Sequence, residues 1–229
     1  MDETYARTYP PAPWHLRGTM YAALWRLPGR LLPGHWELPE PARPLLVGRH
    51  ALVVTAWVDY RPGGTLAYRE LLVALAVRER WRVAACAVEA WVDDERSLAG
   101  GRALWGVPKR PGSFAFAAPS PRGTVRTGLF PDGRAATGDA GAPVTAWHQD
   151  LLRLPGPLPA RGRLLQPAPG PPGGRRTLRV PLRLTGRVRL GRARLAARPG
   201  GPLAFLAGRT PLLALSVRDF RFTVGRAGS

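Results

Sequence analysis

The sequence predicts a β-rich α+β fold in which antiparallel strands curl into a closed or nearly closed barrel with few short helices. Apolar runs of strand length recur along the chain, and short turn signals separate them. Glycine and proline number 27 and 26, which is typical of many turns between short elements. No long amphipathic helix is apparent. We expect a single domain over residues 1–229.

The first 92 residues predict an antiparallel meander. YPPAPW near the start cannot be helical, because proline removes a donor and disfavours helix before it. A strand-like run follows at residues 18–28, and then a proline-rich stretch of turns with one short helical piece. Runs at residues 50–60, 66–79 and 81–92 have strand length, and short turn signals separate them.

At Asp93 the pattern changes from strand to helix. DDERSLAGGRAL offers Asp93 or Asp94 as the N-cap, acidic residues in the first turn and glycines after about two turns. A short helix is therefore expected to lead the chain into WGVPKRPGSFAF.

The C-terminal part combines a connector with further strands. Proline and glycine are dense at about residues 155–176, which predicts an interdomain linker or a long surface excursion. Residues 177–190 alternate leucine or valine with arginine, as in a half-buried strand or a hairpin turning at Thr185-Gly186. We expect a bulge or turn at Gly191 and a final strand within residues 211–224.

Composition narrows the class of protein. The net charge of +19 would suit a nucleic-acid binder, but arginine is spread over the whole chain and the tryptophans are not interleaved with basic residues. We therefore expect no nucleic-acid partner. No run approaches the roughly 20 apolar residues of a membrane helix, and no secretory signal is seen. With Cys86 as the single cysteine, these observations favour a cytoplasmic protein.

Lys109 is the only lysine in a chain that otherwise uses arginine wherever it needs a cation. Arginine stays protonated at any pH a cell reaches, whereas a buried lysine can become a nucleophilic amine. Leu104, Trp105, Val107 and Phe114 lie close in sequence, so burial should disfavour the ammonium form. A surface lysine in a proline turn, the alternative, would have polar neighbours.

The segment GGRALWGVPKR resembles the lysine motif of the acetoacetate decarboxylase family. YPPAPW, TLAYRELLV and AWVDDERSLAGGR also fall where that family places similar segments, so the resemblance covers roughly residues 9–116. It implies a curled antiparallel sheet closed into a cone-like barrel, in a homo-oligomer. It also implies a small oxo-acid or ketone substrate with no cofactor and no metal.

The resemblance assigns roles to individual residues. Lys109 falls on the Schiff-base lysine, Arg110 stands where the founding enzymes have a second lysine, and Glu70 matches an active-site glutamate that could shuttle protons. The implied pocket also includes, by position, Trp105, Tyr68, Thr55, Thr19 and Phe114.

Two of these positions depart from the family pattern. Thr55 stands where the family has a second glutamate, and Thr19 stands at its arginine, with Arg17 two residues away. A substrate carboxylate would lose an obvious partner, which puts acetoacetate decarboxylation itself in question.

Two functions remain open from the sequence. The first is a lyase that forms a lysine Schiff base with a small oxo acid and then performs decarboxylation, aldol or dehydration chemistry. The second is a non-catalytic barrel of the same fold that binds a small apolar ligand. The four histidines are isolated and show no metal-ligand spacing.

Overall fold

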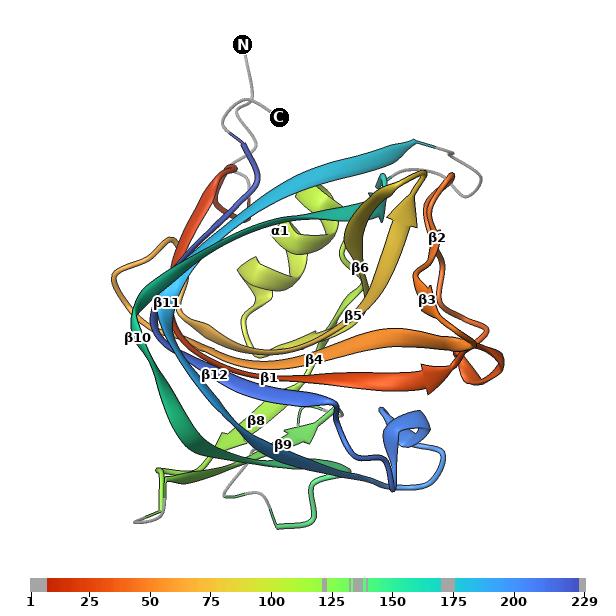
Figure 1. Ribbon diagram of the computed structural model, residues 1–229. Coiled ribbons are helices and arrows are strands. Elements are labelled where there is room, and N and C mark those ends of the chain that lie inside the picture. Colours follow the sequence, from red (N-terminus) through yellow and green to blue (C-terminus); the bar gives the residue numbers. More distant parts are fainter. Residues whose placement is uncertain are drawn as a thin grey trace.

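The structure is a computed structural model that describes residues 8–120, 123–131, 133, 138, 140–169 and 176–226. In these residues a twelve-stranded sheet is accompanied by one α-helix, α1 (Figure 1). The strands are β1 (Trp14–Pro28), β2 (Arg43–Pro44), β3 (Leu46–Val47), β4 (His50–Tyr60), β5 (Tyr68–Glu79), β6 (Arg82–Val92), β7 (Lys109–Pro111), β8 (Ser113–Phe116), β9 (Thr124–Phe130), β10 (Val144–Pro167), β11 (Thr177–Ala197) and β12 (Leu213–Val224). The helices are α1 (Glu95–Trp105) and two 3-10 turns, η1 (Gly29–Leu31) and η2 (Ala204–Leu206).

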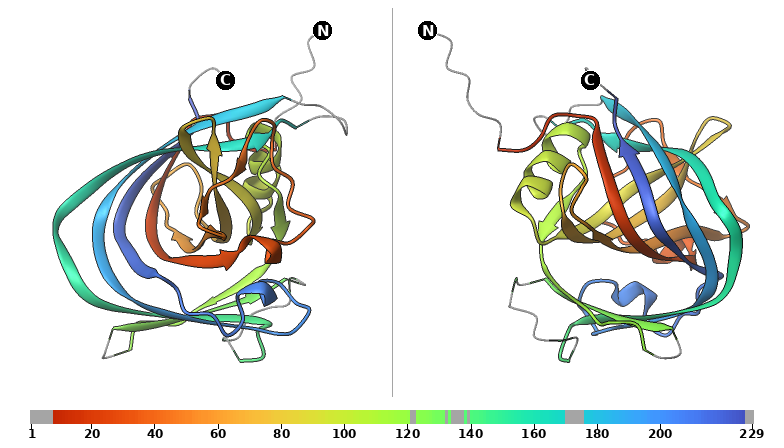
Figure 2. Two further views of the ribbon diagram at one scale, coloured as in Figure 1. Left: turned by 45° about the vertical axis from the view of Figure 1, so that its right-hand side comes forward. Right: turned by 90° about the vertical axis from the view of Figure 1, so that its left-hand side faces the viewer.

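The main strands follow the order β7-β6-β5-β4-β1-β12-β11-β10-β9-β8. All neighbours in that order pair antiparallel except β6 and β7, which run parallel. The sheet curls so strongly that β10 also meets β6, through one parallel bridge between Leu164 and Ala85. Figure 2 shows β10, β11, β12 and β1 as nested arcs around the middle of the molecule.

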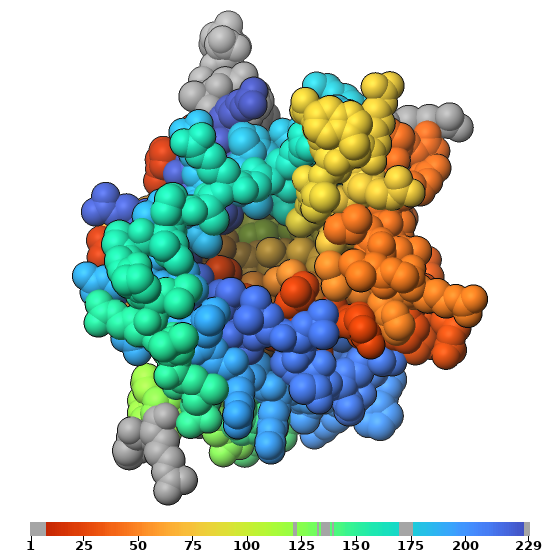
Figure 3. Space-filling view, in the orientation of Figure 1, coloured from red at the N-terminus to blue at the C-terminus, as the bar shows by residue number. Residues whose placement is uncertain are grey.

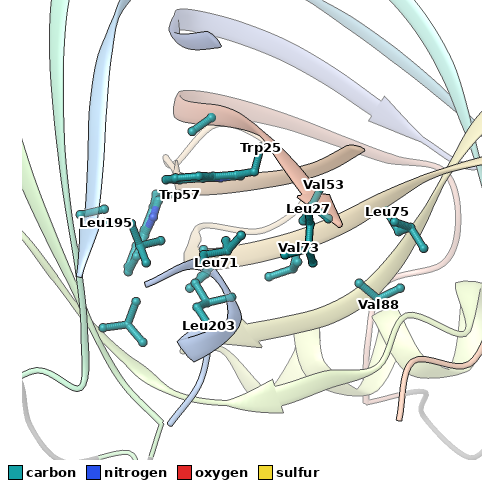
Figure 4. Packing of buried hydrophobic residues seen from close by; sticks show 14 of the residues in the cluster. Trp25, Leu27, Val53, Trp57, Leu71, Val73, Leu75, Val88, Leu195 and Leu203 are labelled. Carbon is teal, nitrogen blue, oxygen red and sulfur yellow. The ribbon is translucent and has the colours of Figure 1, made fainter. Parts of the chain in front are cut away.

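The alternation of side chains divides the buried residues into two clusters on opposite faces of the sheet. Along β1, Tyr21, Ala23, Trp25 and Leu27 belong to the first cluster, which Figure 4 shows with side chains from β4, β5 and η2. The second cluster lies on the other face, beside α1, and contains Trp14, Leu16, Ala56, Val58, Tyr60, Tyr68, Trp105 and Phe220 among others. One sheet therefore supports two cores, as the period of two along each strand requires.

Most predicted elements are confirmed. The expected runs in the first 92 residues are β1, β4, β5 and β6, and the short helical piece predicted in the proline-rich stretch after the first run is η1. The predicted helix is α1, with Asp94 as its N-cap. The expected C-terminal strand is β12.

Residues 155–167 of the predicted connector continue β10, and residues 157–167 pair with β11. Pro157 and Pro159 are two residues apart, so their missing N–H groups face the same side of the strand. β9 pairs only with residues 144–149 of β10. The side of β10 that faces β9 therefore has no partner strand at Pro157 and Pro159. Proline is tolerated at such an edge, which the proline count alone did not reveal. Residues 170–175 of the connector lie outside the described residues.

The arginine-rich alternation is one long strand, β11, and not a hairpin turning at Thr185-Gly186. A register shift against β12 does occur there, between Thr185 and Arg187. The irregularity expected at Gly191 is on its partner strand, since the register of β10 shifts between Asp150 and Leu152. In the part of the chain that the structure describes, no helix has the length and apolar character needed to cross a membrane.

Candidate active site

The segment after α1 delivers Lys109 to the buried face of the sheet. Asp94 caps the helix by accepting a hydrogen bond from the Ser97 backbone N–H at 2.8 Å. Gly106 ends it in the left-handed conformation, with φ of 64°, which glycine adopts without strain. Lys109 then begins β7, and its backbone pairs with Ala90 of β6. The short strand thus fixes the direction in which the lysine side chain leaves the backbone.

Gly101 of α1 makes room for the lysine stem. A Cβ atom at this position would lie only 2.6 Å from both Cδ and Cε of Lys109. Any other residue would therefore push the lysine stem out of its place. This contact gives a physical reason for a glycine eight residues before the lysine.

The amine of Lys109 is buried and has three polar partners. Its Nζ lies 3.0 Å from Oε1 of Glu70 and 2.9 Å from Oγ of Ser97, and it reaches the Tyr68 hydroxyl at 3.4 Å. Lys109 is 4% exposed and Glu70 5% exposed. The structure thus places the buried lysine against the carboxylate of Glu70, although β6 lies between their two strands.

Two tyrosines complete the polar part of the site. The rings of Tyr60 and Tyr68 lie 4.5 Å apart, and the Tyr68 hydroxyl donates a hydrogen bond to Oε2 of Glu70 at 3.3 Å. Burial raises the pKa of both phenols well above the usual value, and the negative charge of Glu70 raises the pKa of each further. Both hydroxyls therefore stay protonated and can act as neutral hydrogen-bond donors.

These groups border a cavity of about 80 Å³ with predominantly apolar walls. The lining residues come from β1, β4, β5, β7, β10, β11, β12, the end of α1 and the segment between α1 and β7. Figure 3 shows a hollow in one face of the molecule, with teal atoms of β10 and yellow atoms of the β5–β6 hairpin at its border. The lining residues are Trp14, Leu16, Tyr60, Tyr68, Glu70, Leu72, Trp105, Val107, Lys109, Leu164, Leu182, Phe222 and Val224. Trp14 and Trp105 meet edge to face, with ring centroids 4.6 Å apart. Lys109 is the only cation among the lining residues.

Of the predicted pocket residues, Trp105 and Tyr68 line this cavity, whereas Thr55, Thr19 and Phe114 do not. Thr55 faces the other core, where its hydroxyl accepts a hydrogen bond from Nε1 of Trp25 at 2.9 Å. Thr19 lines a separate pocket with Asp150, and Phe114 packs against Trp57. Counting along the chain ignored that adjacent strand residues face opposite sides, so an error of one residue exchanges the faces.

Arg110 also lies outside the cavity. Its side chain is exposed, and the guanidinium carbon lies 6.0 Å from the centre of the Trp91 ring. The alternation along β7 directs Lys109 inward and Arg110 outward, so burial and not Arg110 shapes the environment of the amine.

Sequence reasoning missed Tyr60 and Ser97. Tyr60 lies directly opposite Tyr68 in the β4–β5 pair, so the predicted meander could have placed it beside the site. Ser97 carried no signal of its own, since it reads only as a residue in the first turn of a helix. Among the described residues, no group of three histidine, cysteine, aspartate or glutamate side chains is placed to hold a metal ion.

Comparisons with known proteins agree with this arrangement. The family model described as acetoacetate decarboxylase matches residues 30–147, just over half of the chain. No curated protein matches significantly.

Several solved structures share the fold. One, reported as structural studies of acetoacetate decarboxylase, has a TM-score of 0.67 at 17% identity and covers 95% of this chain and 88% of its own. The enduracididine biosynthesis enzyme MppR, with HEPES buffer bound, gives 0.66 at 19% identity, with 97% and 89% covered. An acetoacetate decarboxylase-like enzyme from Sphingomonas wittichii RW1 gives 0.63 at 16% identity, with 98% and 95% covered.

Because these sequence identities are low, the solved structures support the fold alone. The family model adds the sequence match, and it includes the segment from Glu70 to Lys109. The chain therefore belongs to the acetoacetate decarboxylase family.

Proposed function

We propose that this protein is a lyase that forms an imine between Lys109 and a small oxo compound. The observation that carries the proposal is the buried amine 3.0 Å from the carboxylate of Glu70, at the edge of an apolar cavity. An amine in that position is sheltered from water and has one basic group within reach of its proton.

The pair can supply both a nucleophile and a proton carrier. Transfer of the ammonium proton to Glu70 leaves a neutral amine, which adds to the carbonyl carbon of the substrate. Glu70 returns the proton to the carbinolamine oxygen, which leaves as water, so that the ammonium form of the lysine and the carbonyl give one protonated imine (iminium) and one water. As a carboxylate again, Glu70 can accept a proton from the α-carbon, and the enamine then forms.

The enamine could serve several reactions. A β-keto acid would reach it by losing carbon dioxide, and a ketone or aldehyde by losing the α-proton to Glu70. Protonation of the enamine completes a decarboxylation, whereas attack on a second carbonyl compound gives an aldol product. Structures of the relative MppR with pyruvate, and with the condensation product of pyruvate and imidazole 4-carboxaldehyde, support small oxo compounds as the class to test.

We also propose that the sheet closes into the cone-like barrel expected from the family resemblance. The bridge between Leu164 and Ala85, which joins β10 to β6, supports this closure.

Reductive trapping tests the proposed chemistry. The protein is incubated with acetone, pyruvate or acetoacetate and sodium cyanoborohydride, and the adduct is measured by intact mass and located by peptide mapping. Since Lys109 is the only lysine, an adduct on a side chain identifies it directly. Lys109→Arg keeps the charge but has no amine to trap, and it is expected to lose the adduct completely. A wild-type protein that yields no adduct at Lys109 with any of the three compounds would instead support a non-catalytic binding protein.

A further inference from the structure

The charges that line the cavity sum to zero before any substrate enters. Among the described residues, Lys109 and Glu70 are the only charged ones that line the cavity, and they already neutralise each other at 3.0 Å. The remaining lining residues are apolar except for the two phenols, Tyr60 and Tyr68. An inference about the substrate rests on the proposed function, because it concerns the compounds that can form an imine with Lys109.

A substrate carboxylate would disturb this balance. It would enter a small apolar cavity in which the single cation already has a partner, and a buried charge without a partner costs several kcal/mol. The disturbance persists through the reaction, because the iminium and Glu70 cancel and the substrate carboxylate remains as an uncompensated negative charge.

The nearest arginines do not remove this excess charge. Arg102 lies with its side chain outside the cavity and donates from Nε to the backbone carbonyl of Lys109 at 2.8 Å. Arg17 and Arg221 are exposed on the opposite face of β1 and β12, where they line a different pocket.

An uncharged carbonyl compound meets no such penalty. The hydroxyls of Tyr60 and Tyr68 can turn from Glu70 to donate a hydrogen bond to a carbonyl or amide oxygen, and the apolar walls can hold the hydrocarbon part. A cavity of about 80 Å³ is smaller than the roughly 150 Å³ that accommodates benzene, so the ligand should have about six heavy atoms or fewer.

We infer that the cavity selects a small uncharged ketone or aldehyde over an oxo acid of the same shape. The lining charges carry this inference, because they leave no cation for a substrate carboxylate.

The experiment compares pyruvamide with pyruvate, which have nearly the same shape and differ by one charge. Rates of reductive trapping at Lys109 are measured for both, and each is divided by the rate with the free amine of N-α-acetyl-lysine. This division removes the intrinsic difference in reactivity between the two carbonyl groups. The normalised rate is expected to be at least about tenfold higher for pyruvamide.

A variant at the cavity wall tests the inference in the opposite direction, by adding a cation to the cavity. Leu182 lines the cavity from β11 and is half-buried, so a longer side chain there can reach solvent. Leu182→Arg supplies the missing cation and is expected to raise the normalised pyruvate rate at least about tenfold, whereas the matched Leu182→Met should keep the wild-type preference.

The possible outcomes are distinct. Preference for pyruvamide that Leu182→Arg reverses supports the inference. Pyruvate trapped as fast as pyruvamide in the wild-type protein overturns the inference and leaves the imine chemistry standing. Trapping of neither compound at Lys109 overturns the proposed function and the inference with it.

Discussion

Two acid–base clusters, one buried and one half-buried, lie on opposite faces of the sheet, and they use different cations. Beside the cavity, Glu70 faces the amine of Lys109. On the other face, Oδ2 of Asp150 lies 2.8 Å from Nη2 of Arg218 and 3.5 Å from Nη1 of Arg189. Both clusters place a carboxylate against a cation, yet their chemistry differs.

Most groups of this second cluster, the Arg218 cluster of Asp150, Arg218 and Arg189, are hydrogen-bonded, although Nε of Arg189 has no partner among the described residues. Besides Asp150, Arg218 donates to the hydroxyls of Tyr21 and Ser216, and Ser216 donates to Asp150. A guanidinium keeps its proton at any physiological pH, so this cluster can position strands but cannot act as a nucleophile. In the proposed mechanism the amine of Lys109 becomes a nucleophile once its proton moves to Glu70. The choice of cation therefore separates the proposed reactive cluster from the structural one.

The largest expected effect on the chemistry comes from Glu70→Gln. Without its carboxylate the site has no base for the α-proton, so exchange of the hydrogens of acetone with deuterated water should fall at least about 100-fold. Trapping of acetone at Lys109 should fall much less, because the amine itself remains. NMR measures the exchange and mass spectrometry the adduct. An equal loss of both would show that Glu70 only holds the lysine in place.

Gly101→Ala should have the next largest effect. The added methyl group would lie 2.6 Å from the lysine stem and displace the amine from Glu70, so trapping should slow about tenfold or more. Alanine is the better helix former by about 1 kcal/mol, so weakening of α1 cannot explain the loss. Ala103→Gly, on the exposed face of the same helix, is the control and should trap at the wild-type rate. Equal rates for the two variants would contradict the packing argument.

Changes in the Arg218 cluster should alter the stability of the protein without changing the trapping rate at Lys109. Asp150→Asn removes the charge that Arg218 and Arg189 face, which should lower the free energy of unfolding by about 1 to 2 kcal/mol. Urea unfolding measures the loss, and the trapping rate at Lys109 should be unchanged. A slower rate would reveal coupling between the two faces of the sheet.

Low pH should destabilise the folded protein through His148, which lies near the Arg218 cluster. Burial lowers the pKa of this histidine from 6.5 to about 4, with the positive charge of Arg218 acting in the same direction and Asp150 against it. The unfolded chain binds the proton first, so stability present above pH 6.5 is lost as the pH falls toward 4, by about 2 kcal/mol between pH 7 and 5. Urea unfolding of His148→Gln should show a smaller loss over that interval. If both proteins lost the same free energy of unfolding between pH 7 and 5, His148 would not be the cause of the loss.

The sequence was informative where one strong local signal decided the outcome. Alternating apolar residues predicted most strands, and the motif around Lys109 led to Glu70, Tyr68 and Trp105. It failed where the outcome depended on register. Thr55 was placed by counting across the β4–β5 turn, whose length decides the face, and Thr19 sits at a register shift between Gly18 and Met20. The prolines of β10 concealed a strand because only its missing neighbour makes them acceptable.

That Lys109 is the sole lysine also makes the protein convenient to quantify. A small carbonyl reagent fixed by reduction would modify one side chain per molecule, so the modified share of the peptide that contains Lys109 would report the fraction of molecules whose site is intact. Such a count needs no knowledge of the natural substrate, and it would allow every variant to be compared per working site.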